Sequence, residues 1–267
     1  MDVVEMLLGE NAVRLAGWLH QIASGMGLRS IGGNIATIYR HIKSAVNLIY
    51  EFLEHNFLES CIKLPNDSKM PLKFGREWEW DEKVISVTER FSGYPYSHKT
   101  KGKKVIRETI VSSIIDLKTH AVLASEVVGT ASASDLKLVL DKALRRTGFR
   151  KVSIRVDGAS AHKQAVKLSP NKLSLIVLPK KGGRSQLNCI EGFHAYMDRK
   201  LRSGIHGRDP WLVKLIFIHY NFVEGKDSLG GISPIEFARG HQWIKRNEGI
   251  YEMLLSWALK WKLSGLS

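Results

Sequence analysis

Between positions 151 and 158 the chain reads Lys151-Val152-Ser153-Ile154-Arg155-Val156-Asp157-Gly158. β-Branched residues alternate with polar ones, and an acidic residue followed by glycine closes the run, so the pattern predicts a strand ending at Asp157. Helical spacing follows at 161–168, and a second strand is expected at 173–178. Strands that alternate with helices run parallel, so this region forms the parallel part of an α/β sheet.

Upstream of this strand the pattern changes. Three segments rich in β-branched residues, 84–87, 105–117 and 121–128, are joined by short links, which favours an antiparallel meander. A helix is expected at 134–146, and another at 185–202 after Gly182-Gly183. The order is that of a ribonuclease-H-like fold, an α/β fold with a mixed five-stranded sheet of three antiparallel then two parallel strands and flanking helices.

Three acidic residues occupy special places in this order. Asp81 lies at the head of the first strand, Asp157 ends the fourth, and Glu191 lies in the helix after the fifth. The first and fourth strands are neighbours in this fold, so Asp81 and Asp157 should meet, and the helix should bring Glu191 to them. Carboxylates suit Mg²⁺, and two metal ions about 4 Å apart are a common device for displacement at phosphorus.

The charge balance points to a polyanionic partner. The chain of 267 residues carries a formal net charge of +14. Residues 1–70 hold six Lys or Arg against seven Asp or Glu, so the excess lies in the remainder. The two cysteines form no Cys-x-x-Cys pair, which excludes a zinc ribbon. No long apolar run and no positively charged start are present, so we expect no membrane partner and a cytoplasmic, nucleoid-associated location.

The chain divides into four expected regions. Residues 1–61 show helical spacing interrupted by glycines, which favours a small all-α, helix-turn-helix-like DNA-binding domain, with a helical dimerisation domain as the alternative. Its second helix would present Arg40 and Lys43 to DNA. Turn-forming residues mark 62–76 as a linker. The catalytic domain is placed at 77–240, and a C-terminal helical extension at 241–267.

The acidic motifs resemble those of a known family. Trp80-Asp81-Glu82, Ile154-Arg155-Val156-Asp157-Gly158 and Asn188-Cys189-Ile190-Glu191 resemble the three motifs of DDE-type insertion-sequence transposases, whose catalytic domain is retroviral-integrase-like. The likeness is nearest to the insertion sequence six family and its archaeal relatives. Glu191 follows Asp157 by 34 residues, similar to that family's short interval. The interval from Asp81 to Asp157 is 76 residues, longer than is usual there, and the surplus is expected at 94–107.

The resemblance implies a function and its residues. Asp81, Asp157 and Glu191 would be catalytic and would hold two Mg²⁺ ions, for which Mn²⁺ can substitute. The activity would be DNA strand cleavage and strand transfer at the ends of an insertion sequence. The partners would be the element's terminal repeats and target DNA, with the protein acting as a homodimer or a larger assembly. The alternatives are a catalytically silent transposase-derived DNA-binding protein and a ribonuclease-H-like nuclease.

Further residues are expected around the acids. Asn188 and His194 lie three residues before and after Glu191 and can support it, although a satisfied buried histidine is an alternative for His194. Glu79 shares the strand parity of Asp81, whereas Glu82 does not. Basic clusters predict phosphate contacts, since phosphates receive most protein–DNA hydrogen bonds. The residues predicted for DNA binding are Arg40, Lys43, Lys101, Lys103, Lys104, Lys181, Arg184, Arg199, Lys200 and Arg202.

Overall fold

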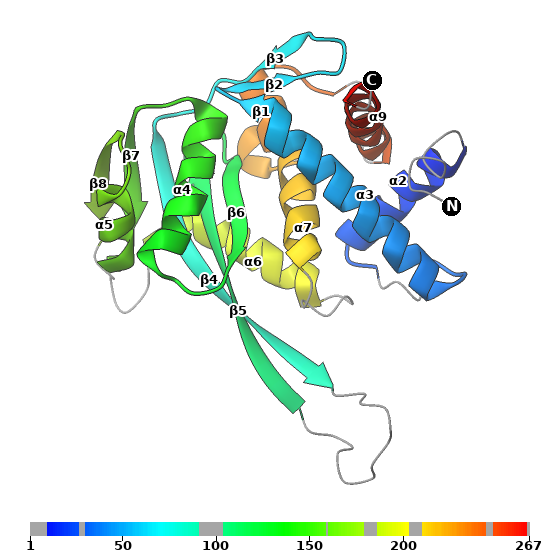
Figure 1. Ribbon diagram of the computed structural model, residues 1–267, viewed down its shortest axis with the longest axis horizontal. Helices are drawn as coiled ribbons and strands as arrows, with labels where there is room; N and C mark the ends of the chain where they lie inside the picture. Colours follow the sequence, from blue (N-terminus) through cyan, green and yellow to red (C-terminus); the bar gives the residue numbers. More distant parts are fainter. Residues whose placement is uncertain are drawn as a thin grey trace.

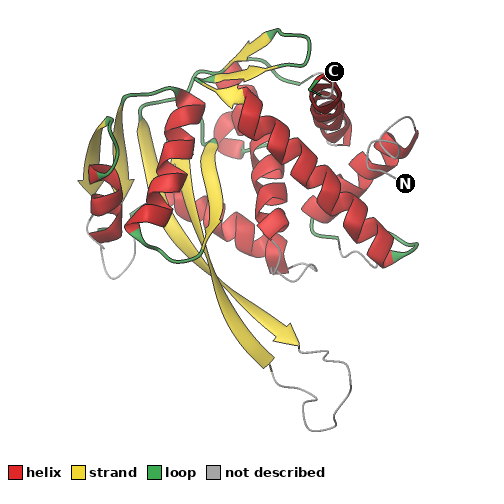
Figure 2. Ribbon diagram, in the orientation of Figure 1, coloured by secondary structure: helices red, strands yellow, loops and turns green. Residues whose placement is uncertain are grey.

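The computed structural model describes residues 10–26, 30–90, 104–158, 160–178, 186–202, 210–243 and 248–265. At its centre is a five-stranded mixed sheet in the order β6-β5-β4-β7-β8 (Figures 1 and 2). Its strands are β4 (Glu77–Arg90), β5 (Lys104–Asp116), β6 (Val122–Val128), β7 (Lys151–Val156) and β8 (Lys172–Val177). β4, β5 and β6 pair antiparallel, and β7 runs parallel to both β4 and β8. This confirms the predicted ribonuclease-H-like fold class.

Helices cover both faces of the sheet. One face carries α4 (Ala133–Thr147) and α5 (Ser160–Lys167), and the other carries α6 (Asn188–Arg202) and α7 (Pro210–Phe222). α4 begins at an N-cap, Ser132, and ends at Gly148, whose positive φ of 69° suits a residue without a side chain. Alternate residues of β7, Val152, Ile154 and Val156, are buried. The alternation that predicted this strand therefore reflects its burial on one face.

The first strand is longer than the sequence pattern indicated. β4 begins at Glu77 rather than near Val84, and its pairing with β5 continues out to Arg90 opposite Lys104. β6 reaches only as far as Val128 opposite Ile110, so beyond that point β4 and β5 form a two-stranded ribbon that projects from the molecule (Figure 1). The long interval between Asp81 and Asp157 contains this ribbon. Residues 94–103 of the expected surplus lie outside the described residues.

The helices of the N-terminal region pack on the C-terminal ones. α2 (Glu10–Ala23) and α3 (Ile35–Asn56) contact α9 (Glu248–Ser264), and α3 also contacts α7. The buried stripe of α3 includes Ile38, Ile42 and Ile49, at helical spacing. After α7 the chain forms a 3₁₀ turn, η2 (Asp227–Leu229), and a short helix, α8 (Pro234–Arg239), which begins with a capping box between Ser233 and Glu236. The buried residues of all these helices belong to one core with those of the sheet.

A small antiparallel sheet joins the two regions. It contains β1 (Phe57–Leu58), β2 (Cys61–Lys63) and β3 (Lys69–Pro71). The segment 62–76, interpreted from its turn-forming residues as a linker, therefore includes paired strands on either side of a turn at 64–68. Strands of two or three residues carry too little alternation to be recognised in the sequence.

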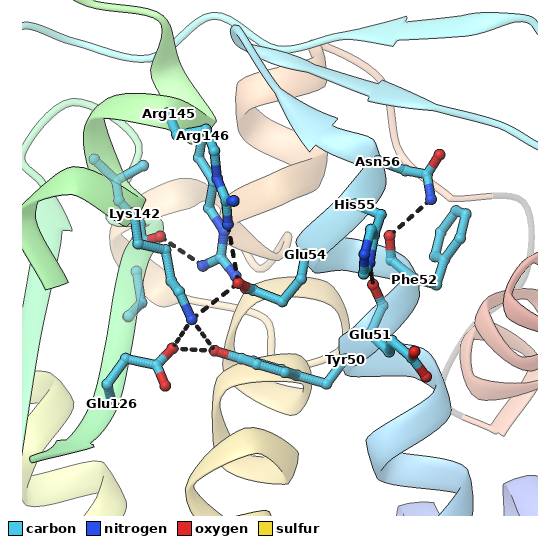
Figure 3. A network of polar contacts seen from close by, with 12 residues as sticks. Tyr50, Glu51, Phe52, Glu54, His55, Asn56, Glu126, Lys142, Arg145 and Arg146 are labelled. Carbon is cyan, nitrogen blue, oxygen red and sulfur yellow. Dashed lines mark hydrogen bonds and ion pairs between the residues drawn. The ribbon is translucent and has the colours of Figure 1, made fainter. Parts of the chain in front are cut away.

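A buried polar network attaches α3 to the large sheet (Figure 3). Glu54 of α3 forms ion pairs with Arg146 and, at 2.9 Å, with Lys142 of α4. Tyr50, one turn earlier, donates a hydrogen bond to Glu126 of β6, which also pairs with Lys142. Arg146 is fully buried, so its charge depends on Glu54 for compensation. Burial alone would raise the pKa of Glu54, but Arg146 and Lys142 outweigh it and lower that pKa.

Candidate active site

Asp81 and Asp157 lie at matching positions of neighbouring strands. The parallel register between β4 and β7 pairs Glu77 with Ser153 and Glu79 with Arg155. Two residues further along the chain come Asp81, within β4, and Asp157, the first residue after β7. Both continue the parity of Glu79, whose side chain meets α6. The predicted meeting of the first and fourth strands is therefore present in the structure.

Asp81 occupies an unfavourable place for a negative charge. Its side chain is about one-fifth exposed. Burial raises the pKa of its carboxyl group from 3.8 to about 6, and the nearby charges of Glu82 and Asp157 act in the same direction. A hydrogen bond from the backbone of Glu82 and the neighbouring His162 only partly offset these effects. Two carboxylates that repel each other in a partly buried position form a site that a cation would stabilise.

Glu79 fixes the beginning of α6 to the sheet. The backbone N–H of Ile190, in the first turn of α6, donates a 2.9 Å hydrogen bond to the Glu79 carboxylate. The Glu79 side chain is buried. Burial raises its pKa, although hydrogen bonds from the backbone of Ile190 and Cys189 counteract part of this effect. A carboxylate at a helix N-terminus satisfies backbone donors that lack partners within the helix. Glu191, the next residue, is thereby held beside β4.

Two further contacts continue along β4 and α6. His194 Nδ1 lies 3.7 Å from Asp81 Oδ2, and Lys83 forms a 2.8 Å ion pair with Asp198. Residues 79, 81 and 83 lie on one face of the strand, and residues 190, 194 and 198 lie on one face of the helix. Asp198 therefore has a basic partner on the neighbouring strand.

His194 is buried, but it is not fully satisfied. Its Nε2 atom has no hydrogen-bond partner in the part of the chain that the structure describes. Burial lowers the pKa of the imidazole to about 4, with help from the charge of Lys83. A buried histidine, as the alternative supposed, therefore lies next to Asp81, and its Nε2 atom lacks a partner among the described residues.

Glu82 takes part in a separate network on the opposite face of β4. It accepts hydrogen bonds from Ser112, at 3.1 Å, and from His162 of α5, at 2.9 Å. Trp80 donates to the same Ser112 hydroxyl, and its ring makes an edge contact with His162. Trp78 and Trp80 are fully buried, as expected for core residues. Strand parity therefore correctly predicted that Glu82 and Glu79 lie on opposite faces of β4. The hydrogen bond between His162 and Glu82 had no signal in the sequence.

The three predicted acids do not form a closed metal cage. Glu191 is exposed in the first turn of α6. Within the described ranges, no group of three or more His, Cys, Asp or Glu side chains is arranged closely enough to hold a metal ion. The structure brings Asp81 and Asp157 together on one face and sets Glu191 on the adjoining helix. The oxygen donors of the pair suit Mg²⁺.

The predicted DNA-binding residues are scattered. Arg40 is exposed near the start of α3, and its Nε donates to the backbone of Ala36. Arg199 is exposed on α6, and Lys200 lies over the Tyr196 ring at 5.2 Å. The remaining DNA-binding candidates are Lys43, partly exposed on α3, Lys104 and Arg202, described only as the ends of β5 and α6, and Lys101, Lys103, Lys181 and Arg184, which lie outside the described residues. Asn188, predicted to support Glu191, is exposed at the start of α6.

The sheet order β6-β5-β4-β7-β8, with its antiparallel and parallel pairings, is that of the ribonuclease-H-like fold class. Among solved structures, the catalytic core domain of BIV integrase is 13% identical and matches 61% of this chain and 93% of its own, with a TM-score of 0.42. A pre-cleavage Mos1 transpososome is 13% identical over 81% of this chain and 61% of its own, with a TM-score of 0.32. A Mos1 mariner paired end complex with Mn is 13% identical over 82% and 59%, with a TM-score of 0.29.

These similarities concern the fold alone, because the identities are low. This chain spans about three-fifths of the length of the Mos1 chains that it matches. No protein-family model and no curated protein sequence matches it. In the described part of the chain, none of the helices has the length and apolar character needed to span a bilayer.

Proposed function

We propose that this protein is a DDE-type transposase that cuts DNA strands at the ends of an insertion sequence and joins them to a target. The observation that carries the proposal is the β4–β7 register, which sets Asp81 beside Asp157 on the face covered by the helix bearing Glu191. The net charge of +14 supports a DNA substrate. The sequence motifs favour the insertion sequence six family.

Asp81, Asp157 and Glu191 are proposed to hold two Mg²⁺ or Mn²⁺ ions. When bound, the ions would activate a water or a 3′-hydroxyl and stabilise the leaving oxygen. Asp157 would hold the ions together with Asp81, whose pKa is raised mainly by burial and further by the charges of Glu82 and Asp157. A bound cation would favour the ionised form of both carboxylates. Glu191 would complete the set after its exposed side chain turns toward the strands. Phosphate oxygens of the DNA would supply further ligands, since Mg²⁺ is usually bound by one or two carboxylates together with substrate phosphates.

The protein's own side chains would position this chemistry. Glu79 would keep the first turn of α6 against β4, so that Glu191 stays within reach of Asp81. His194, neutral because burial lowers its pKa, would orient the Asp81 carboxylate or a water through its ring nitrogens. Arg199 and Lys200 on the same helix would contact the DNA backbone. Two DNA ends must be brought together for joining, so the active form is proposed to be at least a homodimer.

A strand-transfer assay tests the proposal. The protein is incubated with labelled DNA from the flanks of its own gene, a supercoiled target plasmid and Mg²⁺ or Mn²⁺. We expect cleaved ends and joined products that disappear with EDTA and in Asp157→Asn. Binding without cleavage would favour a silent DNA-binding protein, and cleavage without joining would favour a nuclease. Lys167→Gln, an exposed change on α5, serves as the matched control and should leave the products unchanged.

A further inference from the structure

A large groove lies away from the carboxylates, between β3, the segment after α8, and α9. Its volume is about 1000 Å³, at the upper end of the range for ligand pockets. The described residues that line it include none of Asp81, Asp157 and Glu191. Figure 1 shows β3 and α9 at the end of the molecule opposite the β4–β5 ribbon. A site of this size suits an extended ligand better than a single ion.

Two indole rings form the floor of this groove. The Trp243 ring is almost fully buried, and its Nε1 donates a 3.2 Å hydrogen bond to the backbone carbonyl of Phe222. The backbone N–H of Trp243 donates to Glu236 at 2.6 Å, so both the ring and the chain are fixed. Trp257 of α9 is half-buried and meets Trp243 edge to face, with ring centroids 6.3 Å apart. Trp257 is therefore a partly open aromatic surface on a rigid support.

Positive charges surround the aromatic floor. The lining includes four Lys or Arg side chains and a single acidic one, Glu252. The guanidinium of Arg239 lies 4.8 Å from the centroid of the Trp243 ring. The other three cations are exposed, Lys69 and Lys73 on the β3 side and Lys260 on α9. Four cations against one carboxylate, with cations on both the β3 side and α9, favour an anionic chain as the ligand of this groove.

We propose that this groove binds a single-stranded segment of nucleic acid. Single strands are held by aromatic side chains that stack on bases and by cations that follow the phosphates, and the groove offers both. A duplex keeps its bases stacked inside and would use the lysines alone. An acidic peptide would likewise gain nothing specific from Trp257. The proposal does not depend on the carboxylate site, because it concerns a different surface.

The test measures binding of a fluorescent twelve-nucleotide oligothymidine by anisotropy, in an Asp157→Asn background that prevents cutting. We expect Trp257→Ala to weaken binding about tenfold and Trp257→Phe to retain most of it, because a phenyl ring still stacks. Lys69→Glu combined with Lys260→Glu should lower the slope of log affinity against log salt by about 1.4, the value for two lost phosphate contacts on a single strand. An oligonucleotide with 5-iodouracil should cross-link to Trp257 on irradiation.

The matched control is Lys167→Glu with Lys172→Glu, two exposed lysines on α5 and β8 that lie outside the groove. This pair should leave the salt slope within about 0.3 of the parent value. Thermal unfolding checks that each variant is folded, and the salt slope and the cross-link preserve the test if Trp257→Ala is not. Parent affinity in folded Trp257→Ala, cross-links only outside the groove, or equal competition by polyglutamate would each overturn the proposal. Because the background is already inactive, these results do not depend on whether the protein is a transposase.

Discussion

At the residue scale, Asp81 makes the clearest electrostatic prediction. Its pKa rises from 3.8 to about 6 on folding, so the folded state binds this proton more tightly than the unfolded state does. The ionised carboxylate therefore lowers stability above pH 6, and this cost disappears as the pH falls toward 4. In EDTA at pH 8, we expect Asp81→Asn to raise the free energy of unfolding by about 1–3 kcal/mol.

Urea denaturation of both proteins between pH 4 and pH 8 measures this difference. The gain in Asp81→Asn should shrink steadily below pH 6 and be absent near pH 4. Asp141→Asn, at a surface ion pair of α4, is the control and should show no such trend. A constant difference between Asp81→Asn and the parent at every pH would contradict the electrostatic cause.

Glu79 makes a second residue-scale prediction. Its carboxylate is buried and accepts the Ile190 N–H, so its removal leaves a helix N-terminus with unsatisfied donors. Glu79→Ala should therefore lower the free energy of unfolding by about 1–3 kcal/mol. Glu79→Gln keeps an acceptor in the same place and should cost less. Hydrogen exchange of the first-turn amides of α6 would locate the effect, and uniform exchange changes across the protein would argue against this anchoring role.

At the element scale, the network around Glu54 ties α3 to α4 and β6 (Figure 3). Arg146 is fully buried, so Glu54→Gln would leave its charge without its main partner. Breaking a buried pair in this way typically costs about 3–5 kcal/mol. Replacing both residues, as Glu54→Leu with Arg146→Met, should recover much of the loss because the fully buried guanidinium is removed and Lys142 keeps its pair with Glu126. The measurement is urea unfolding followed by circular dichroism, and a cost of Glu54→Gln below about 1 kcal/mol would contradict the structure's account of this network.

The elements also show what the sequence can and cannot predict. The sequence predicted the bounds of β7 to within one residue, because buried and more exposed residues alternate along the whole strand. β4 was expected only from about Val84, since its beginning carries acids at 77, 79 and 81, which are typical of exposed loops. These acids are accommodated by partners distant in sequence, such as the Ile190 N–H and Arg155. Local sequence patterns contain no information about such distant partners. For the same reason the sequence did not predict the contact of His162 with Glu82 or the ion pairs that attach α3 to α4.

At the scale of the whole molecule, the arrangement predicts that metal binding and stability are linked. Asp81 and Asp157 are neighbours before any ion arrives, whereas Glu191 is exposed on α6. Affinity for Mg²⁺ in the absence of DNA should therefore be weak, because two carboxylates supply the contacts and the third must move. At a concentration a hundred times the dissociation constant, a ligand that binds only the folded state stabilises it by about 2.7 kcal/mol.

We therefore expect Mg²⁺ or Ca²⁺ to raise the Tm of the parent protein at millimolar concentrations. Asp157→Asn should abolish this rise, and Glu191→Gln should reduce it less, because the exposed Glu191 contributes little before DNA binds. Asp81→Asn, already relieved of repulsion, should start from a higher Tm in EDTA and gain little from either ion. An equal rise in the parent and in Asp157→Asn would place the ions elsewhere on the protein. If Glu191→Gln reduced the metal-induced rise in Tm more than Asp157→Asn did, Glu191 on α6 would contribute more to metal binding than the carboxylates of the strand pair.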